Sequence, residues 1–114
     1  MSKEVKNKTT WQADDTHPEL ASSIRERLRE VVDPELGLNI IELGLIREVE
    51  IDNEQVKVTM ILTTPFCPYG PALLEAARSK AQEALDNPVE IEMGIEMWDL
   101  SFMEEGVGAD WGLF

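Results

Sequence analysis

The chain contains one cysteine, Cys67, and its thiol is the strongest nucleophile and soft metal ligand that the sequence offers. Cys67 lies in the segment Leu62-Thr63-Thr64-Pro65-Phe66-Cys67-Pro68-Tyr69-Gly70-Pro71, where prolines and a glycine shape the backbone. A thiol just before a helix N-terminus faces the positive end of the peptide dipoles, which favours the thiolate. A buried, unreactive side chain explains the residue equally well, because free cysteines are among the most buried residues. The residues alone leave both roles open.

Two regular elements are expected to hold this segment in place. Alternating, β-branched residues from Val56 to Leu62 predict a strand. Apolar residues at three- and four-residue spacing from Ala72 to Leu85 predict a helix. Pro71 suits the first turn of that helix, where a missing N–H costs no hydrogen bond. Cys67 is therefore expected in a loop that joins a strand to a helix.

Three further elements are predicted from patterning and capping. A helix begins at the capping box Thr16-His17-Pro18-Glu19 and stops at Asp33-Pro34, because the residue before a proline disfavours the helical conformation. A strand over 45–51 forms a hairpin with the strand that begins at Val56. The run from Val89 to Met97 alternates without interruption, which predicts a third strand with one apolar face on the core.

The order helix, strand, strand, helix, strand predicts an α/β (α+β) fold. We expect a two-layer sandwich in which both helices cover one face of a small mixed sheet, with the third strand parallel to the second. Residues 1–15 are expected to form a flexible leader, 16–100 the domain, and 101–114 an apolar acidic tail that packs on it. Trp11, alone in the leader, either packs back on the domain or is exposed.

Composition limits the partners of the chain. Its 114 residues suffice for one domain with a core, and a single cysteine excludes an internal disulfide. We therefore expect a reducing compartment, the cytoplasm or a plastid stroma, and no apolar run is long enough to span a membrane. Ten basic residues against 23 acidic ones give a net charge of −13, which disfavours nucleic acid and anionic membrane surfaces as partners. Basic protein partners remain open, although a solvated acidic face explains the charge as well.

Several thiol and metal chemistries do not fit the spacing. A cysteine phosphatase requires an arginine six residues after the cysteine, where this chain has Leu73. A papain-like enzyme requires a histidine base, whereas the only histidine, His17, begins the first helix. One thiol and one histidine cannot complete a zinc site, and no glycine-rich phosphate loop is present. What remains is a single activated thiol that could take part in metal or cluster binding across a dimer or act as a thiol carrier.

A second group of polar side chains precedes the first strand. The loop from Asp33 to Ile46 carries many aliphatic residues, which must reach the core. Among its polar residues, Asp33, Glu35 and Asn39 could cap turns or could line a site beside Cys67. The spacing does not decide between these two interpretations.

These two segments together resemble a known family. The stretch Asp33-Pro34-Glu35-Leu36-Gly37-Leu38-Asn39-Ile40-Ile41-Glu42-Leu43-Gly44-Leu45-Ile46, followed by Met60-Ile61-Leu62-Thr63-Thr64-Pro65-Phe66-Cys67-Pro68, is similar to the MIP18 family, or DUF59 domain, which includes the SufT and PaaD-like proteins. The resemblance covers about residues 17–100 and implies an iron–sulfur assembly type fold. It also implies a role in maturing iron–sulfur proteins, with assembly proteins and client apo-proteins as partners. We therefore expect a maturation factor without enzymatic activity. The implied functional patch comprises Asp33, Glu35, Thr63, Thr64 and Cys67.

The resemblance leaves the molecular role open. As a carrier, the chain would bind iron or a transient iron–sulfur cluster through Cys67, and a homodimer, a small thiol or a client would supply the other ligands, because clusters are usually held by four cysteines. As an adaptor without metal, it would dock the assembly machinery onto clients through the acidic loop and the apolar tail. A redox thiol is a weaker interpretation, because no resolving cysteine is present.

Overall fold

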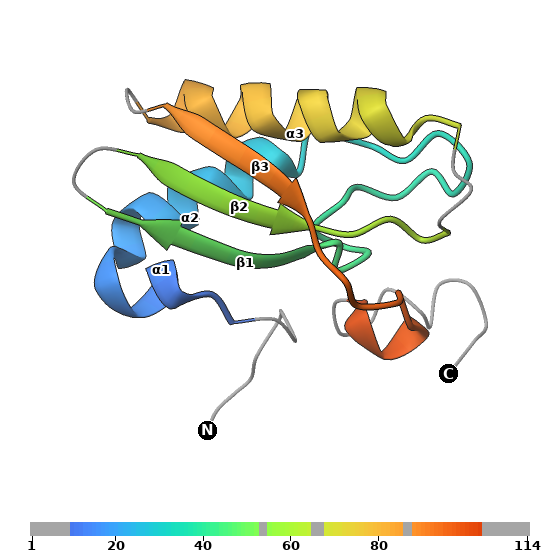
Figure 1. Cartoon of the computed structure of the whole chain (residues 1–114), viewed down its shortest axis with the longest axis horizontal. Coiled ribbons are helices and arrows are strands. Elements are labelled where there is room, and N and C mark those ends of the chain that lie inside the picture. The colour runs from blue at the N-terminus through green and yellow to red at the C-terminus, as the bar shows by residue number, and fades with distance from the viewer. Residues whose placement is uncertain (1–9, 53–54, 65–67, 86–87, 104–114) are drawn as a thin grey trace.

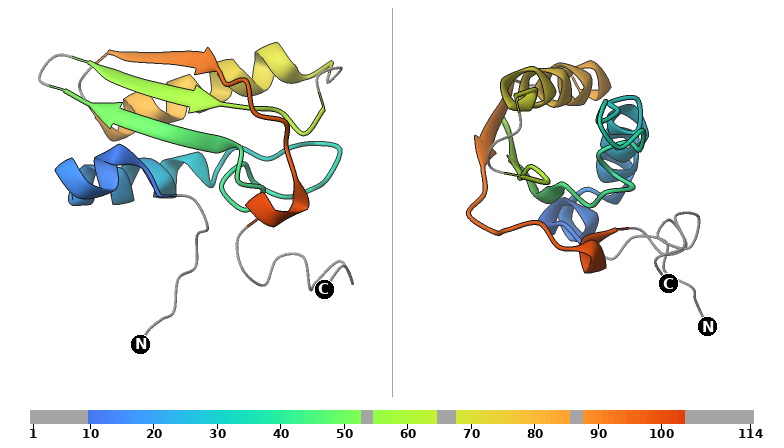
Figure 2. Two further views of the ribbon diagram at one scale, coloured as in Figure 1. Left: turned by 60° about the horizontal axis from the view of Figure 1, so that its bottom comes forward. Right: turned by 90° about the vertical axis from the view of Figure 1, so that its right-hand side faces the viewer.

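A layer of helices packs on one face of a small sheet (Figures 1 and 2). The computed structural model describes residues 10–52, 55–64, 68–85 and 88–103. In chain order the elements are α1 (Gln12–Thr16), α2 (Pro18–Leu28), β1 (Ile46–Ile51), β2 (Val56–Met60), α3 (Gly70–Ala84), β3 (Val89–Met93) and the 3₁₀ helix η1 (Leu100–Phe102). The right-hand view of Figure 2 places α2 and α3 next to each other on the same side of the strands. The predicted two-layer α/β sandwich is confirmed.

The sheet has the strand order β1-β2-β3, so β2 is central. β1 and β2 pair antiparallel, as a hairpin requires, and β2 and β3 pair parallel through the α3 crossover. The β2 side chains at alternate positions, Val56, Val58 and Met60, are buried. They contribute to a core that also contains Ile24 and Leu28 of α2 and Leu73 and Ala77 of α3. Mixed pairing was expected, and the structure adds that β3 lies beside β2 at an edge.

The segment before α2 differs from its prediction. The flexible leader was expected to reach residue 15, but Trp11 is 2% exposed and Gln12–Thr16 forms α1, so this prediction is wrong from Trp11 onward. Residues 1–9 lie outside the described residues. The ring of Trp11 fills an apolar site and its Nε1 donates to the carbonyl of Ile46, 3.1 Å away. A lone tryptophan gives no periodic signal, which is why the pattern missed this contact.

The predicted capping box at Thr16 is also wrong. Thr16 ends α1, and His17 is the N-cap of α2 without a side-chain capping bond. The capping interaction occurs one helix earlier, where Asp14 accepts a hydrogen bond from the backbone N–H of Trp11 at 2.7 Å. Pro18, at the first position of α2, supplies the fixed φ that starts the helix.

The end of α2 lies earlier than expected. The helix stops at Leu28 rather than at Asp33-Pro34, and the backbone N–H groups of Glu30 and Val31 bond to carbonyls only three residues back. Val31 still points into the core, because it is 5% exposed. A proline sets the latest position at which a helix can end, and the last α-helical turn can close several residues earlier.

The third strand is shorter than its alternation predicted. β3 ends at Met93, and the apolar residues beyond it are exposed, Ile95 by 100% and Met97 by 81%. The expectation that its whole apolar face covers the core is wrong beyond Ile91. The ladder ends because β2 ends at Met60, whose carbonyl accepts the last bond from Gly94 at 2.8 Å. In the described ranges, none of the helices has the length and apolarity to cross a membrane.

Candidate functional site

The loop between β2 and α3 contains the candidate thiol. Cys67 lies outside the described residues, together with Pro65 and Phe66. The described flanks are Thr63 and Thr64, which are half-buried, and Pro68 and Tyr69, which are exposed. The two sides are packed together, since a Cβ added at Gly70 would lie only 2.8 Å from Cδ1 of Leu62. The start of α3 is therefore held against the end of β2.

The loop between α2 and β1 is organised by Asp33. This carboxyl group is 1% exposed, and its Oδ1 accepts a hydrogen bond from the backbone N–H of Glu35 at 2.8 Å. The carbonyl of Asp33 accepts from Gly37 at 2.8 Å, and Gly37 has a φ of +73°, which favours glycine. Asp33 thus shapes a turn from the interior, whereas Glu35 is exposed.

Asn39 and Glu42 close a second turn in the same loop. The backbone N–H of Glu42 donates to Oδ1 of Asn39 at 2.7 Å, and the backbone N–H of Asn39 donates to Oε1 of Glu42 at 2.9 Å. This reciprocal pair has the pattern of a capping box. Of the two roles that the sequence left open for Asp33 and Asn39, turn capping is the one observed.

The two loops lie at the same end of the sheet, on the right in Figure 1. The left view of Figure 2 agrees with this placement. Asp33 and Thr63 therefore belong to neighbouring loops, but the described bonds of the Asp33 carboxylate remain within its own loop. The grouping of Asp33, Glu35, Thr63, Thr64 and Cys67 into one patch stays a prediction.

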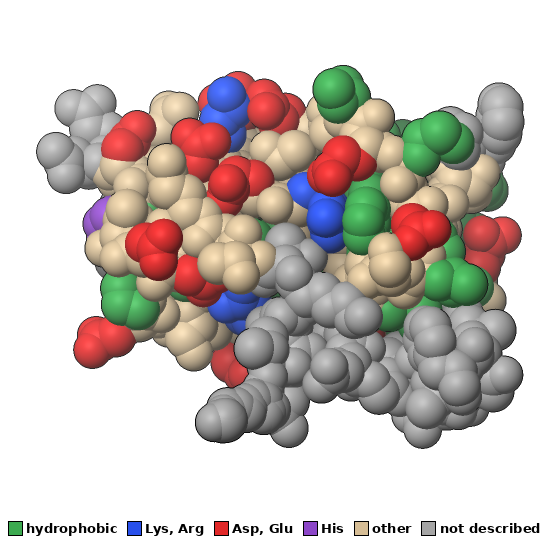
Figure 3. All heavy atoms as spheres, turned by 90° about the horizontal axis from the view of Figure 1, so that it is seen from below, with side chains coloured by type: hydrophobic (Ala, Val, Ile, Leu, Met, Phe, Trp, Pro, Cys, Tyr) green, Lys and Arg blue, Asp and Glu red, His purple; other side chains and the backbone are tan. Residues whose placement is uncertain are grey.

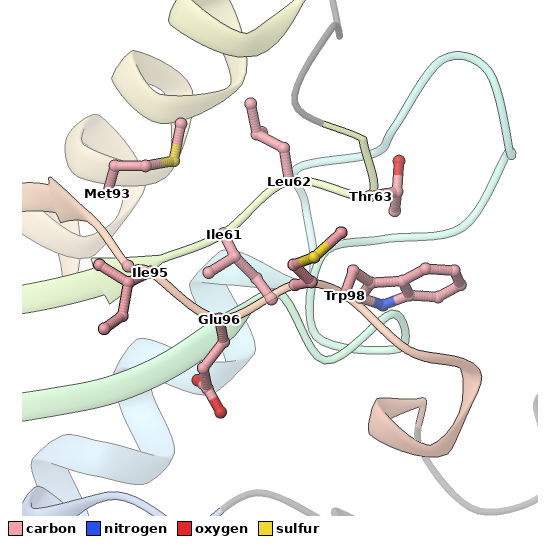
Figure 4. Close-up of a pocket in the computed structure, with 9 residues that line it drawn as sticks. Ile61, Leu62, Thr63, Met93, Ile95, Glu96 and Trp98 are labelled. Carbon is pink, nitrogen blue, oxygen red and sulfur yellow. The ribbon is translucent and has the colours of Figure 1, made fainter.

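A pocket that the sequence did not reveal lies beside the β2–α3 loop (Figure 4). It has a volume of about 370 Å³ and is lined by Ile61, Leu62, Thr63, Met93, Gly94, Ile95, Glu96, Met97 and Trp98. Figure 4 shows Leu62 and Met93 pointing toward α3, whereas Ile95 and Glu96 point to the opposite side. The signal was present as the long apolar alternation after Val89, which reads as core unless the length of the neighbouring strand is known.

Residues 94–103, which we call the strap, cross the end of the sheet toward β1 (Figure 1), and the first five of them, 94–98, line this pocket. Trp98 Nε1 donates to the carbonyl of Leu43 at 2.7 Å. The guanidinium of Arg47 lies 3.7 Å from the centre of the Phe102 ring, and its Nε is 3.0 Å from Glu96 Oε1. Of the tail expected to pack on the domain, 101–114, the structure describes 101–103, where Met103 is 1% exposed; the packing of the whole tail stays a prediction. Residues 104–114 lie outside the described residues.

Carboxylates dominate the surface around these elements. In Figure 3, which shows one face of the molecule, acidic side chains clearly outnumber lysine and arginine. On the strap, the hydroxyl and backbone N–H of Ser101 donate to Asp99 and hold the pKa of that carboxyl below its usual 3.8. Among the described residues, no three histidine, cysteine, aspartate or glutamate side chains gather closely enough to hold a metal ion.

Three comparisons relate this chain to known proteins. The family described as "Iron-sulfur cluster assembly protein" matches residues 21–93. The chain is 43% identical over 54 residues to the "Fe-S protein maturation auxiliary factor SufT" of Staphylococcus aureus, which covers 46% of this chain and 61% of that protein. It is 38% identical over 68 residues to the "Iron-sulfur cluster carrier protein" of Synechocystis sp., and this alignment covers 60% of this chain and 19% of that protein.

The alignments with these two relatives thus span less than two thirds of their lengths. Among solved structures, the "Domain of Unknown Function DUF59 from Bacillus anthracis" superimposes with a TM-score of 0.76 at 23% identity. That superposition covers 88% of this chain and 98% of the other, and at this identity it shows the shared fold. The resemblance to the DUF59 domain is confirmed.

Proposed function

Because the chain belongs to the iron–sulfur cluster assembly protein family, we propose that it carries iron or an iron–sulfur cluster to apo-proteins, with Cys67 as the ligand it contributes. We further propose that it acts without catalysing a reaction, in the cytoplasm, together with assembly proteins and client apo-proteins.

The observation that carries the proposal is the anchoring of both ends of the Cys67 loop. Gly70 packs against Leu62, so α3 starts directly beside the end of β2. In the sequence Cys67 precedes the first residue of α3 by three positions. Backbone N–H groups at a helix N-terminus favour an anion, and a thiolate is the form of cysteine that binds iron. These features support a metal-binding role over a buried, inert thiol.

One thiolate cannot hold a cluster alone. Clusters are usually bound by four thiolates, and the described residues offer no cluster of acidic, histidine or cysteine side chains to complete the set. We propose that a second copy of the chain, a small thiol or the client itself supplies the missing ligands. An incomplete ligand set suits transfer, because the cargo leaves when a client offers more thiolates.

The test is anaerobic reconstitution with ferrous iron and sulfide. The visible spectrum, iron content and native mass are compared between the wild type and Cys67→Ser. We expect a charge-transfer spectrum in the wild type, its loss in Cys67→Ser, and a native mass that tells whether two copies share the cargo.

A matched control moves the thiol elsewhere. The double variant Cys67→Ser with Ser22→Cys places one thiol on the exposed face of α2 and is expected to bind no iron. Iron binding by this variant would mean that any surface thiol suffices, which contradicts the proposal. If neither the wild type nor Cys67→Ser binds iron while both stay folded, the carrier role is wrong and the adaptor role replaces it.

A further inference from the structure

The pocket beside the Cys67 loop is lined by several apolar side chains that are exposed to solvent. Ile95 is 100% exposed, Met97 81% and Met93 51%. Single exposed apolar residues are ordinary on protein surfaces, but adjacent ones around a concave site mark a contact surface. The pocket volume of about 370 Å³ is at the small end of the range for ligand sites, roughly 300–1,000 Å³, and is enough for an apolar side chain.

The shape of the pocket follows from the way two parallel chains separate. β2 and β3 remain paired up to Met60 and Met93, and Gly94 adds one more bond to Met60. Beyond this point, residues 61–63 continue toward α3, whereas the strap turns away to reach Leu43 and Arg47. Thr63, four residues before Cys67 in the sequence, is among the residues that line the opening between them. An occupant of the pocket would therefore lie beside the Cys67 loop.

The strand next to the pocket is an edge. β3 pairs only with β2 among the described strands, so an extended segment can approach its other side. The exposed β3 side chains Glu90 and Glu92 lie along this edge, and Glu96 follows on the strap. The chain has no lysine or arginine after Lys80. The nearby cations are Lys57, 3.5 Å from Glu92, and Arg47, 3.0 Å from Glu96.

The charge selects among possible occupants. A second copy of the chain placed edge to edge would bring Glu90 and Glu92 of both copies together, and each copy carries a net charge of −13. Like charges opposite each other on paired strands are destabilising. A segment with basic side chains meets the opposite situation, because it is attracted both by the edge and by the whole molecule.

We propose that this pocket binds an extended segment of a partner protein that carries one aliphatic side chain flanked by lysine or arginine. The aliphatic side chain enters between Leu62 and the strap, and the basic residues contact Glu90, Glu92 and Glu96. This inference rests on the proposed function, because it specifies the segment by which a client or an assembly protein presents itself to the Cys67 loop.

The test uses fluorescent eight-residue peptides and the full-length protein. The probe peptide has one leucine in a background of lysine and serine. Of two control peptides, one replaces the leucine by serine and the other replaces the lysines by glutamates. The leucine–lysine peptide is expected to bind at least about tenfold more tightly than the serine–lysine peptide, since burying one aliphatic side chain is worth about that factor. It is also expected to bind more tightly than the glutamate peptide, whose charges are repelled by this surface. Amide chemical shifts on titration are expected to change at 61–63 and 93–98.

Two variants and their controls test the location. Ile95→Ser is expected to weaken binding about tenfold, while Val32→Ser, an equally simple change at another exposed apolar residue, leaves it unchanged. Glu90→Lys is expected to weaken peptide binding severalfold without making the affinity more dependent on salt concentration. Glu50→Lys on β1 is expected to have a smaller effect. Ile95 and Glu90 are exposed, so neither substitution removes a core contact.

Each contrary result overturns the proposal. Equal binding of the serine–lysine peptide would show a purely electrostatic attraction. Shifts at 93–98 that depend on protein concentration without peptide would make a second copy the occupant. Deletion of 104–114 could instead raise the affinity for the peptide and remove the chemical shift changes at 93–98. That result would make the chain's own C-terminal segment the occupant.

The outcome is separable from that of the iron test. Ile95→Ser is expected to show the same reconstituted spectrum as the wild type, and Cys67→Ser is expected to bind the peptide normally. A failure of iron binding with intact peptide binding removes the carrier function alone. A failure of peptide binding with an intact spectrum removes the docking inference alone.

Discussion

Trp11 and Trp98 make similar hydrogen bonds and lie near similar arginine contacts, but they differ in how far they are buried. Each indole donates to a backbone carbonyl at β1 or just before it, Trp11 to Ile46, the first residue of β1, at 3.1 Å and Trp98 to Leu43 in the preceding loop at 2.7 Å. Each region also has an arginine stacked on an aromatic ring and paired with a carboxylate. At the N-terminal end Arg25 lies 3.8 Å above the Trp11 ring and 2.9 Å from Asp14.

At the C-terminal end the corresponding arginine is Arg47, stacked on Phe102 and paired with Glu96. Trp11 is almost wholly buried, and the helix that follows it covers its site. Trp98 is half-buried, and its neighbours Ile95 and Met97 remain exposed. The same set of interactions therefore closes the fold at one end and holds an open apolar surface at the other.

The largest expected effect is the difference in unfolding free energy between alanine variants of the two tryptophans. Trp11→Ala should lower the free energy of unfolding by about 3–5 kcal/mol, because it removes a fully buried ring. Trp98→Ala should cost clearly less and should instead abolish peptide binding at the pocket. Urea unfolding and the peptide titration measure both quantities. Equal losses of stability would mean that the strap is as much a part of the core as α1.

A pair of glycines isolates the contribution of the strap. Gly37 and Gly44 have φ values of +73° and +74°, so an alanine at either is strained by about 1 kcal/mol. At Gly37 a Cβ meets nothing within 4 Å, whereas at Gly44 it would lie 2.0 Å from the carbonyl oxygen of Phe102. Gly44→Ala should cost about 3 kcal/mol in all and displace the strap. Equal unfolding free energies for the two variants would contradict the close packing of strap on loop.

The two arginines offer a smaller contrast. Arg25→Lys and Arg47→Lys keep the charge and lose the planar stacking, which should cost about 1 kcal/mol each by urea unfolding. Only Arg47→Lys is expected to change the affinity for the leucine–lysine peptide, because it loosens the wall of the pocket. An effect of Arg25→Lys on peptide binding would break the distinction between the two regions.

The smallest effect concerns acid stability. Burial raises the pKa of the Asp14 carboxyl, but hydrogen bonds from Arg25 and from the N–H of Trp11, together with the Arg25 charge, hold it below 3.8. Stability from this group is therefore fully present above the unfolded pKa near 3.8 and is lost as the pH falls through the lower folded pKa. Asp14→Asn should flatten that part of the stability profile. Urea unfolding at a series of pH values compares Asp14→Asn with the wild type, and an identical profile for the two would contradict this expectation.

Much of the fold was predictable because its main elements are periodic. The alternation in Val56–Met60 and the helical spacing in Gly70–Ala84 report directly which side chains face the core, so the strand, the helix and the loop between them were placed within a few residues. The buried aliphatics of the Asp33–Ile46 loop were also expected. Trp11 was missed as a core residue, because a single buried ring has no period.

The candidate site was predictable only in part. The sequence identified the two loops, and the fold places them at the same end of the sheet. It could not show that Asp33 is buried and shapes a turn while Glu35 remains exposed, because both carry the same charge and lie two residues apart. The role of Cys67 stays a prediction that the iron test addresses.

The sequence by itself determined the five main elements, their order and the place of the thiol between a strand and a helix, because local spacing encodes which face of each element is apolar. The tertiary structure decided what covers those faces. The alternation through Ile95 and Met97 is the same on both sides of Met93, yet the ladder with β2 ends there and leaves the later residues exposed. Burial depends on a partner strand from elsewhere in the chain, and no local pattern contains the length of that partner.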